Sequence, residues 1–580
     1  MFRTILLLAC LAAGCGAGPP PSILLVSIDT LRADALGCYG NAASRTPRAD
    51  RLAAEGVRFE TCVTPCPLTL PAHATILTGL PPPSHDLRDN DPPRPLPPAA
   101  NRPFRTVAEE LQSRGYTTAA FVSSSVLAAR TGLDAGFSVY DGPDSAVPGE
   151  VRYAERAGGD TARAAASWLA SSPRPFFLFV HLFDPHDPYE APAAFRRGAA
   201  PGTPEAYAEE VAYADSCLGV LLDALHAAGH EPDTFVLFAS DHGEGLGEHG
   251  EATHGYLLTE ATLRVPLLLR WPGRLPAGAA RADPVGLGSV ATAILEAAGA
   301  AATTSSTLLH GPAGDGPLCS ETLYGYRRMG WAQLFAAREG TVKLVRGNRT
   351  ECYDLAADPR EEASRPDVPV ALAAAMERYR SLAPLAEPVG TGLPELAGFP
   401  YAAGIGRSRL RVLPWAENEA LPSPDGRFAA RFDRLASVVG RDPAAEAGLL
   451  ELAAEAPANP SVAFWLGRAH RHSAHWPDAA RAFGRAFDSG LREAKVLDLW
   501  LQALLLVPDL AEADRVASRH VAEVVPDTGT WLMLAVLRHH QGRIDEAASL
   551  LARADAAAVT DADRLEVSRF RHNLGIQNDK

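Results

Sequence analysis

The sequence has few cysteines, no excess of positive charge and no long apolar run beyond its first residues. Its eight cysteines are scattered and no Cys-x-x-Cys spacing occurs, so we assign them no metal or redox chemistry. Lys and Arg number 54 against 69 Asp and Glu, and the net charge of −15 argues against a nucleic-acid binder. Beyond residue 21, no uncharged segment is long enough to span a bilayer.

The first residues have the pattern of an export signal. Arg3 precedes an apolar run over 5–13, which is too short for a transmembrane helix. Residues 12–15, Ala-Ala-Gly-Cys, resemble a bacterial lipoprotein cleavage box in which Cys15 is lipidated; a plain signal peptide is the alternative. We expect residues 1–21 to be a lipoprotein-type signal peptide and tether, and the mature protein to be periplasmic or membrane-anchored through lipid.

The length of 580 residues and the content of 47% hydrophobic and 21% charged residues predict a globular protein of two or three domains. Short apolar runs alternate with helical patterns, which predicts an α/β catalytic domain over 22–375. Residues 376–430 enclose a stretch rich in Pro and Gly and are predicted to form a linker.

The last part, 431–580, repeats with a period of 34 residues. Alanines recur at that spacing, and the positions four residues after each are mostly large and apolar: Ala445, Ala479, Ala513 and Ala547, followed by Leu449, Phe483, Ala517 and Leu551. This period predicts an all-α, tetratricopeptide-like repeat domain, with a plain helical bundle as the alternative. Such repeats bind a protein or peptide in a concave groove, or pack on the domain before them.

Polar residues follow three of the apolar runs. Asp29 ends the run 22–28, a cluster with His181, Asp184 and His186 follows 175–180, and Asp241-His242 follows 234–239. In open α/β sheets ligands collect at the carboxyl ends of strands, so these groups are predicted to meet.

Thr69 is predicted at the start of a short helix that ends near Gly79. Pro71 suits a first helical turn because it lacks the amide hydrogen that would be unpaired there. A helix N-terminus favours anions, so an oxyanion could be held against the Thr69 hydroxyl; a simple capping role is the alternative.

Together these residues predict a metal-activated nucleophile. Asp29, Thr69, Asp241 and His242 form a candidate ligand set for Zn²⁺ or Mn²⁺, with Ca²⁺ as a third option, and the ion would lower the pKa of the Thr69 hydroxyl. His186 and His254 are candidate catalytic groups that hold remaining oxygens or protonate the leaving group. His73 and Asn90 are predicted to contact the substrate, a small anionic ester.

Five motifs in order resemble one known family. VSIDTLRAD (26–34), LPAHATILTG (70–79), SDHGE (240–244), RVP (264–266) and YDL with DP (353–359) occur as in sulfatases of the alkaline phosphatase-like superfamily. The resemblance covers about 22–362. It implies a sandwich with a central mixed, mostly parallel sheet, a metal at the strand ends, and ester hydrolysis through a covalent enzyme intermediate.

The sequence departs from that family at three positions. The usual Cys or Ser that becomes formylglycine is replaced by Thr69, which cannot give that aldehyde, and His73 stands where the motif has Arg. Thr30 replaces the second Asp of the usual pair. Threonine nucleophiles are what the superfamily's phosphodiesterases, phosphonate hydrolases and phosphoethanolamine transferases use, often with two metals, and Asp184, His186 and His254 are candidates for a second site.

Three functions therefore remain open from the sequence. The first is an exported metal-dependent hydrolase of sulfate or phosphate esters; the second is a phosphodiesterase, phosphonate hydrolase or phosphoethanolamine-type transferase using the same Thr69 intermediate. The third is a non-catalytic scaffold that acts through its repeats.

Overall fold

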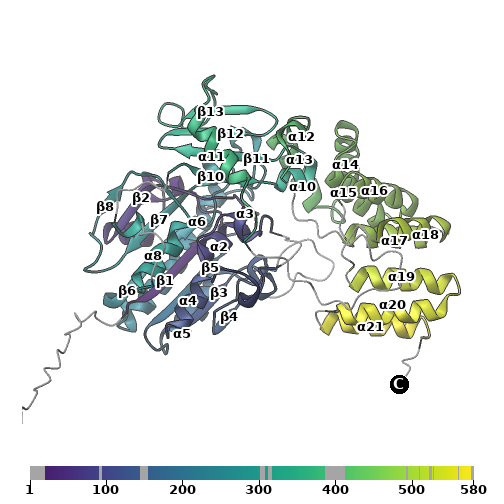
Figure 1. Cartoon of the computed structure of the whole chain (residues 1–580), viewed down its shortest axis with the longest axis horizontal. Coiled ribbons are helices and arrows are strands. Elements are labelled where there is room, and N and C mark those ends of the chain that lie inside the picture. Colours follow the sequence, from purple (N-terminus) through teal and green to yellow (C-terminus); the bar gives the residue numbers. More distant parts are fainter. Residues whose placement is uncertain are drawn as a thin grey trace, which may run out of the picture.

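The computed structural model describes residues 20–90, 95–143, 154–300, 307–310, 316–385, 412–491, 494–507, 510–521, 526, 528–558 and 561–576. They form an α/β part built on two sheets and a helical part that follows it (Figure 1). The predicted leader over 1–21, with Cys15, lies almost wholly outside the described residues, as does 386–411 of the predicted linker.

The larger sheet is mixed and mostly parallel, as predicted. Its order is β4-β3-β5-β1-β6-β7-β2-β8, with β9 also on β2. Antiparallel pairing is confined to β7, which runs against both β6 and β2. The strands are β1 Ser22–Ile28, β2 Val57–Val63, β3 Thr117–Val122, β4 Val139–Asp141, β5 Phe176–Leu182, β6 Thr234–Ser240, β7 Arg264–Arg270, β8 Ala279–Arg281 and β9 Val285–Gly286.

Helices cover both faces of this sheet because side chains alternate along each strand. Ile23 and Leu25 of β1 point to one core, which α2 Thr69–Thr78, α4 Val107–Ser113 and α8 Ser289–Ala297 complete. Leu24 and Val26 point to the other, under α1 Pro47–Ala54, α5 Gly158–Leu169 and α6 Pro204–Ala227. All seven residues of β1 are buried, as the continuous apolar run predicted.

The smaller sheet is antiparallel, with the order β10-β11-β12-β13. Its strands are β10 Leu318–Thr322, β11 Leu334–Glu339, β12 Val342–Arg346 and β13 Thr350–Asp354. Strands β12 and β13 form an antiparallel hairpin. Helix α11, Val370–Arg380, packs on this sheet through Leu372, Met376 and Tyr379. Short helices α3 Pro82–His85, α7 Glu260–Leu263, α9 Thr307–His310 and α10 Tyr324–Met329 connect the larger elements.

The described end of the predicted linker, 412–430, contacts the α/β part. It contains α12, Trp415–Glu419, and the start of α13, Gly426–Ser437. Asn418 accepts a hydrogen bond from the backbone N–H of Gln333 at 2.8 Å and donates one to its carbonyl at 3.0 Å. The backbone N–H of Leu413 donates to the Gln333 side chain at 3.0 Å. These bonds tie the segment to the start of β11.

The remaining helices form a curved array (Figure 1). They are α14 Ala444–Glu455, α15 Pro460–His472, α16 Trp476–Asp488, α17 Ala494–Leu506, α18 Leu510–His520, α19 Thr528–His540, α20 Ile544–Ala557 and α21 Asp561–Asn573. The four alanines spaced by 34 residues lie on α14, α16, α18 and α20, and none is more than 2% exposed. Small residues there let the helices pack closely.

The helical part is joined to the α/β part by an apolar cluster. Tyr256 and Trp331 of the α/β part pack with Phe428 of α13 and with Leu449 and Val462 of the first repeated helices. Within the described part of the chain, no helix has both the length and the apolar character needed to cross a membrane.

Candidate active site

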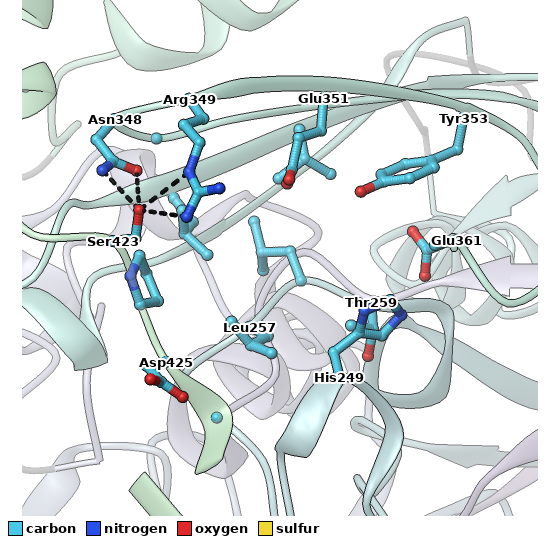
Figure 2. A pocket seen from close by; sticks show the side chains of 16 residues that line it. His249, Leu257, Thr259, Asn348, Arg349, Glu351, Tyr353, Glu361, Ser423 and Asp425 are labelled. Carbon is cyan, nitrogen blue, oxygen red and sulfur yellow. Dashed lines mark hydrogen bonds between the residues drawn. The ribbon is translucent and has the colours of Figure 1, made fainter. Parts of the chain in front are cut away.

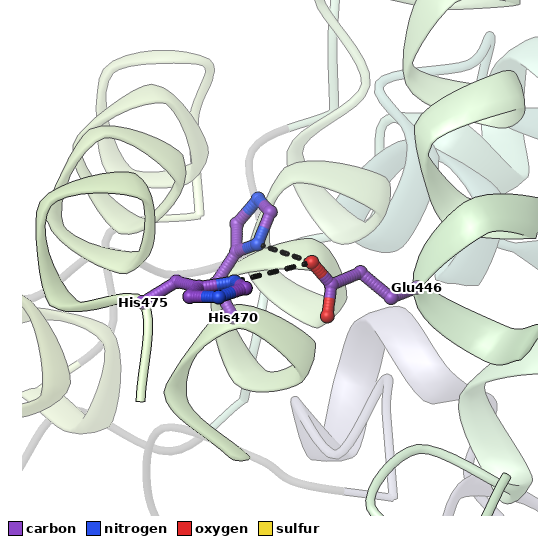
Figure 3. Close-up of side chains that lie close together, drawn as sticks. All are labelled: Glu446, His470 and His475. Carbon is purple, nitrogen blue, oxygen red and sulfur yellow. Dashed lines mark hydrogen bonds and ion pairs between the residues drawn. The ribbon is translucent and has the colours of Figure 1, made fainter. Parts of the chain in front are cut away.

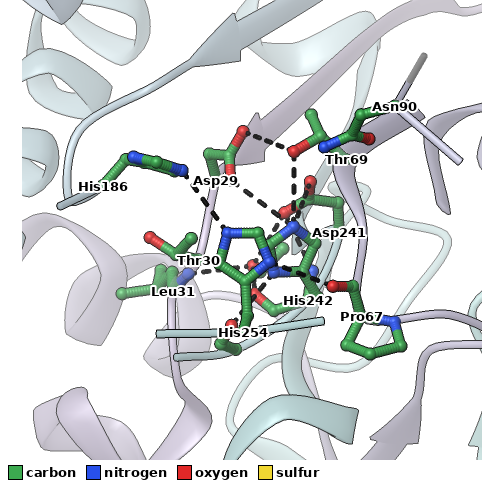
Figure 4. Close-up of polar contacts among 12 residues, drawn as sticks. Asp29, Thr30, Leu31, Pro67, Thr69, Asn90, His186, Asp241, His242 and His254 are labelled. Atoms are coloured by element: carbon green, nitrogen blue, oxygen red, sulfur yellow. Dashed lines mark hydrogen bonds and ion pairs between the residues drawn. The ribbon is translucent and has the colours of Figure 1, made fainter. Parts of the chain in front are cut away.

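Two buried carboxylates meet at the ends of the central strands. Asp29 follows β1 and Asp241 follows β6, and neither side chain is exposed. Ile28 pairs with Ser240 in the parallel register, so the next residue of each strand lies at the same edge of the sheet. Figure 4 shows the two carboxylates converging with Thr69 and His242.

Thr69 is the first residue of α2, as predicted, and its side chain is directed at these groups (Figure 4). Its Oγ1 lies 3.3 Å from Asp29 Oδ2 and 3.4 Å from His242 Nε2. The backbone N–H of Leu70 donates to Asn90 Oδ1 at 2.9 Å, so Asn90 satisfies an amide of the helix start and lies beside Thr69. The hydroxyl is therefore held on a rigid element.

His242 presents an unprotonated nitrogen to the carboxylates. Its Nδ1 donates to the carbonyl of Gly243 at 3.0 Å, which leaves the lone pair on Nε2. Nε2 lies 3.6 Å from Asp29 Oδ1 and 3.4 Å from Asp241 Oδ2. Burial lowers the pKa of His242 to about 4, although Asp29 acts to raise it, so the ring is neutral at neutral pH. A neutral imidazole in this orientation is a metal ligand.

The two carboxylates leave oxygens that the protein does not satisfy. Asp29 Oδ1 and Asp241 Oδ2 are buried and accept no hydrogen bond, and with His242 they offer ligand atoms within 4.8 Å of one another. Burial and the charge of Asp29 raise the pKa of Asp241 well above its usual range. Burial also acts to raise the pKa of Asp29, but the hydrogen bond to His181 and the nearby His242 hold it below its usual range. A divalent cation would compensate both charges, so these residues fit a metal.

Two further histidines lie behind the carboxylates. His181 on β5 contacts Asp29 Oδ2 through Nε2 at 3.2 Å, a contact that sequence reasoning gave no role. His73 donates from Nδ1 to the carbonyl of Thr69 at 2.8 Å, and its Nε2 accepts from Ser27 Oγ at 2.9 Å. Burial lowers the pKa of His73 to about 3, with His181 adding to the effect. Since protein atoms engage both its nitrogens, His73 orients Thr69, and substrate contact through its ring nitrogens is not favoured.

His186 and His254 form a pair beside His242 (Figure 4). The Nδ1 of His186 donates to the carbonyl of Asp187 at 2.9 Å and that of His254 to Pro67 at 3.0 Å. Their Nε2 atoms face each other at 3.4 Å, and the His254 ring lies 4.2 Å from that of His242. Burial lowers the pKa of His254 well below its usual range. The pair offers lone pairs that a proton or an acidic substrate group could bridge.

Comparisons with known proteins find sulfatases among the relatives of this chain. Residues 21–300 match the family model described as Sulfatase. The chain is 28% identical over 410 residues to steryl-sulfatase of Mus musculus, covering 51% of this chain and 65% of that protein. It is 29% identical over 336 residues to arylsulfatase A of Homo sapiens, covering 47% of this chain and 63% of that protein. Residues 21–300 are therefore similar to sulfatases.

Solved structures show the same fold for this domain. A 2-O GAG sulfatase superimposes with a TM-score of 0.51 and 19% identity, covering 63% of this chain and 91% of that one. The phosphonate monoester hydrolase of Agrobacterium radiobacter gives a TM-score of 0.50 and 22% identity, covering 62% and 94%. The chain spans just under two thirds of the length of the curated relatives named above.

Thr30 is engaged away from the carboxylates. Its Oγ1 donates to the carbonyl of Pro185 at 2.7 Å, and its φ of 53° is a left-handed conformation that costs a β-branched residue about 1–2 kcal/mol. The hydroxyl is thus not part of the candidate ligand set. Backbone strain of this kind persists where surrounding contacts enforce it, and such positions cluster at functional sites.

The residues predicted for a second metal do not form a ligand cluster. Asp184 instead accepts the backbone N–H of Gly158 at 2.8 Å, at the start of α5. Among the described residues, the groups of three or more metal-ligating side chains are Asp29, Asp241 and His242, and a second group in the helical part: Glu446, His470 and His475.

A separate cavity of about 370 Å³ lies between the small sheet and the start of α13 (Figure 2). Its lining includes His249, Arg349, Glu351, Tyr353 and Asp425, and none of the candidate catalytic residues. It holds no constellation that matches the chemistry around Thr69. The candidate catalytic residues therefore lie at the strand ends and not in this cavity.

Proposed function

We propose that the protein is a metal-dependent, sulfatase-like hydrolase that cleaves sulfate or phosphate esters through a covalent intermediate on Thr69. The observation that carries the proposal is the position of Thr69 Oγ1, 3.3 Å from Asp29 and 3.4 Å from His242, beside two unsatisfied carboxylate oxygens. The relatives named above, steryl-sulfatase and arylsulfatase A, support the sulfate ester as the first substrate class to test.

A divalent ion held by Asp29, Asp241, His242 and Thr69, with Zn²⁺ or Mn²⁺ favoured, would lower the pKa of the Thr69 hydroxyl and offset substrate charge. Thr69 Oγ1 releases its proton to solvent water and attacks the sulfur or phosphorus, and the bond from that atom to the ester oxygen breaks. His186 or His254 gives the departing alcohol its proton. Water then attacks the same atom, which frees the inorganic anion and regenerates Thr69.

The electrostatics of the His186–His254 pair suit this role. Burial lowers the pKa of His254, with the neighbouring His242 and His186 adding to the effect, so the free site holds the His254 ring neutral. An anionic ester placed against them favours the protonated form because opposite charges raise a histidine pKa. We therefore expect the acid on His254 to form when the substrate binds.

A phosphonate or phosphodiester substrate is the second candidate. The observation that favours it is the unmodifiable hydroxyl of Thr69 at the nucleophile position, where the resemblance expects Cys or Ser. The shared fold with a phosphonate monoester hydrolase is compatible with this reading but shows the fold alone.

The substrate class and the nucleophile can be tested together. The purified chain is offered aryl sulfate, phosphate monoester, phosphodiester and phosphonate monoester substrates, with and without a chelator. We expect turnover of one class, lost on chelation, and a fall of at least about 1,000-fold in kcat for Thr69→Ala. Equal turnover by Thr69→Ala would overturn the assignment, and no turnover of any substrate by metal-loaded wild type would favour the scaffold reading.

We also propose export and a tetratricopeptide-type partner surface. The leader pattern over 1–21 supports lipidation at Cys15, which Cys15→Ala would abolish in a fatty-acid labelling experiment. The buried alanines of period 34 support stacked helical pairs that bind a protein or peptide.

A further inference from the structure

A second cluster of metal-ligating side chains lies in the helical part, outside the candidate active site. Glu446 comes from α14, His470 from α15, and His475 from the turn before α16. The Nδ1 of His470 lies 2.9 Å from Glu446 Oε1 and the Nδ1 of His475 lies 3.6 Å from the same oxygen. Figure 3 shows both rings directed at this carboxylate.

These distances fit the coordination shell of zinc. Ligands placed about 2.0–2.1 Å from a tetrahedral Zn²⁺ are about 3.3 Å from one another. The two nitrogen-to-oxygen distances of 2.9 and 3.6 Å bracket that value, and all three ligand atoms lie within 4.8 Å of one another. Two imidazoles and a carboxylate are a donor set that zinc accepts, with water as the fourth ligand.

The backbone and one neighbouring hydroxyl hold these ligands in place. The N–H of His475 donates to the carbonyl of His470 at 2.8 Å, and the N–H of Ala474 to that of Arg471 at 3.1 Å, which is the Schellman pattern at a helix end. Ala474 has a φ of 57°, a conformation that favours glycine. Ser473 Oγ donates to Glu446 Oε2 at 2.7 Å and so orients the carboxylate.

The cluster is also accessible from solvent on one side. The His470 side chain is 11% exposed, that of Glu446 is 23% exposed and that of His475 is 59% exposed. An ion can therefore enter at His475, while His470 supplies a ligand fixed in the helical array. A hydrogen bond between His470 and Glu446 alone would not require the exposed His475 beside it.

We propose that Glu446, His470 and His475 bind a zinc ion that joins α14 to the α15–α16 turn. The ion links three chain segments, so it stabilises the folded helical part by binding it in preference to the unfolded chain. This site is independent of the proposed hydrolytic function, since none of its residues contacts the strand ends.

The experiment compares zinc binding by full-length variants that differ at single surface positions. The chain is stripped with a chelator and dialysed against buffered free Zn²⁺, and bound zinc is counted by elemental mass spectrometry. The variants are His475→Gln and Glu446→Gln. The matched control is His472→Gln, which changes an exposed histidine on α15, the helix of His470. Asp241→Asn reports on the other site, and circular dichroism checks that each variant stays helical.

We expect His475→Gln and Glu446→Gln each to lose one zinc, with at least a tenfold weaker apparent affinity, while His472→Gln matches wild type. Zinc should also raise the unfolding temperature of wild type and His472→Gln but not of His475→Gln. Combining Asp241→Asn with His475→Gln should remove zinc additively. If His475→Gln, which is exposed and should fold, binds as much zinc as His472→Gln, the site is an ordinary histidine–glutamate hydrogen bond and the proposal is wrong.

Discussion

Asp433 on α13 should make the contact between the two parts of the protein sensitive to pH. Tyr256, which lies in the loop that also carries His254, donates a hydrogen bond from its OH to Asp433 Oδ1 at 3.2 Å. Burial raises the pKa of Asp433 from 3.8 to about 7, with Asp187 adding to the effect and Tyr256 opposing it. The folded protein therefore binds a proton more tightly here than the unfolded chain does.

The sign and size of the effect follow from this difference. Between pH 3.8 and about 7 the folded state holds the proton that the unfolded state has lost, so stability falls as pH rises through this window. At 1.36 kcal/mol for each pH unit the loss would reach about 4 kcal/mol for a fully buried group. Because Asp433 is only partly buried, we expect about 1–2 kcal/mol.

Asp433→Asn tests this because asparagine keeps the acceptor for Tyr256 but cannot ionise. At pH 8 we expect the free energy of unfolding of the variant to be about 1–2 kcal/mol higher than that of wild type. Near pH 4 this difference should vanish. The measurement is urea unfolding followed by circular dichroism at several pH values. Asp488→Asn, at an exposed position on α16, serves as control and should stay within about 0.5 kcal/mol. If the difference in free energy of unfolding between wild type and Asp433→Asn does not change from pH 4 to 8, the reasoning is refuted.

Two further substitutions test the packing around the site and in the helical part. Arg88→Met should cost about 3–5 kcal/mol in chemical denaturation, because it leaves Glu321 buried without its two hydrogen bonds of 2.7 and 2.5 Å. Arg88→Met with Glu321→Leu should recover most of that loss; no recovery would show that the pair is not the cause. Gly467→Ala should lower stability by about 1–3 kcal/mol, since the new Cβ would lie 2.7 Å from the buried Phe483 ring. A gain of about 1 kcal/mol, the helix preference of alanine, would contradict that prediction; Phe483→Leu should relieve the clash.

The sequence predicted the central groups because their chemistry is local. The apolar run 22–28 is β1, and Asp29 follows it directly, so the strand end could be read from the chain itself. Thr69 likewise precedes Pro71 and opens α2, and Gly79 adopts the left-handed conformation expected at a helix end, with a φ of 71°.

Contacts between distant segments could not be read in this way. That His181 reaches Asp29 depends on β5 pairing with β1, and that His73 turns to Ser27 depends on how α2 lies on the sheet. The sequence alone does not tell whether the Thr30 hydroxyl faces the candidate metal ligands. Only its hydrogen bond to the carbonyl of Pro185 shows that it is engaged away from them. The bond from Tyr256 to Asp433 had no local signal at all.

The central claim is that Thr69, set against Asp29, Asp241 and His242, becomes the attacking group. The most direct test is rapid quenching of metal-loaded protein with its best substrate, followed by peptide mass spectrometry. The account predicts a sulfuryl or phosphoryl group on Thr69, absent after chelation and in Thr69→Ala. Label on another residue, or full turnover by Thr69→Ala, would contradict it.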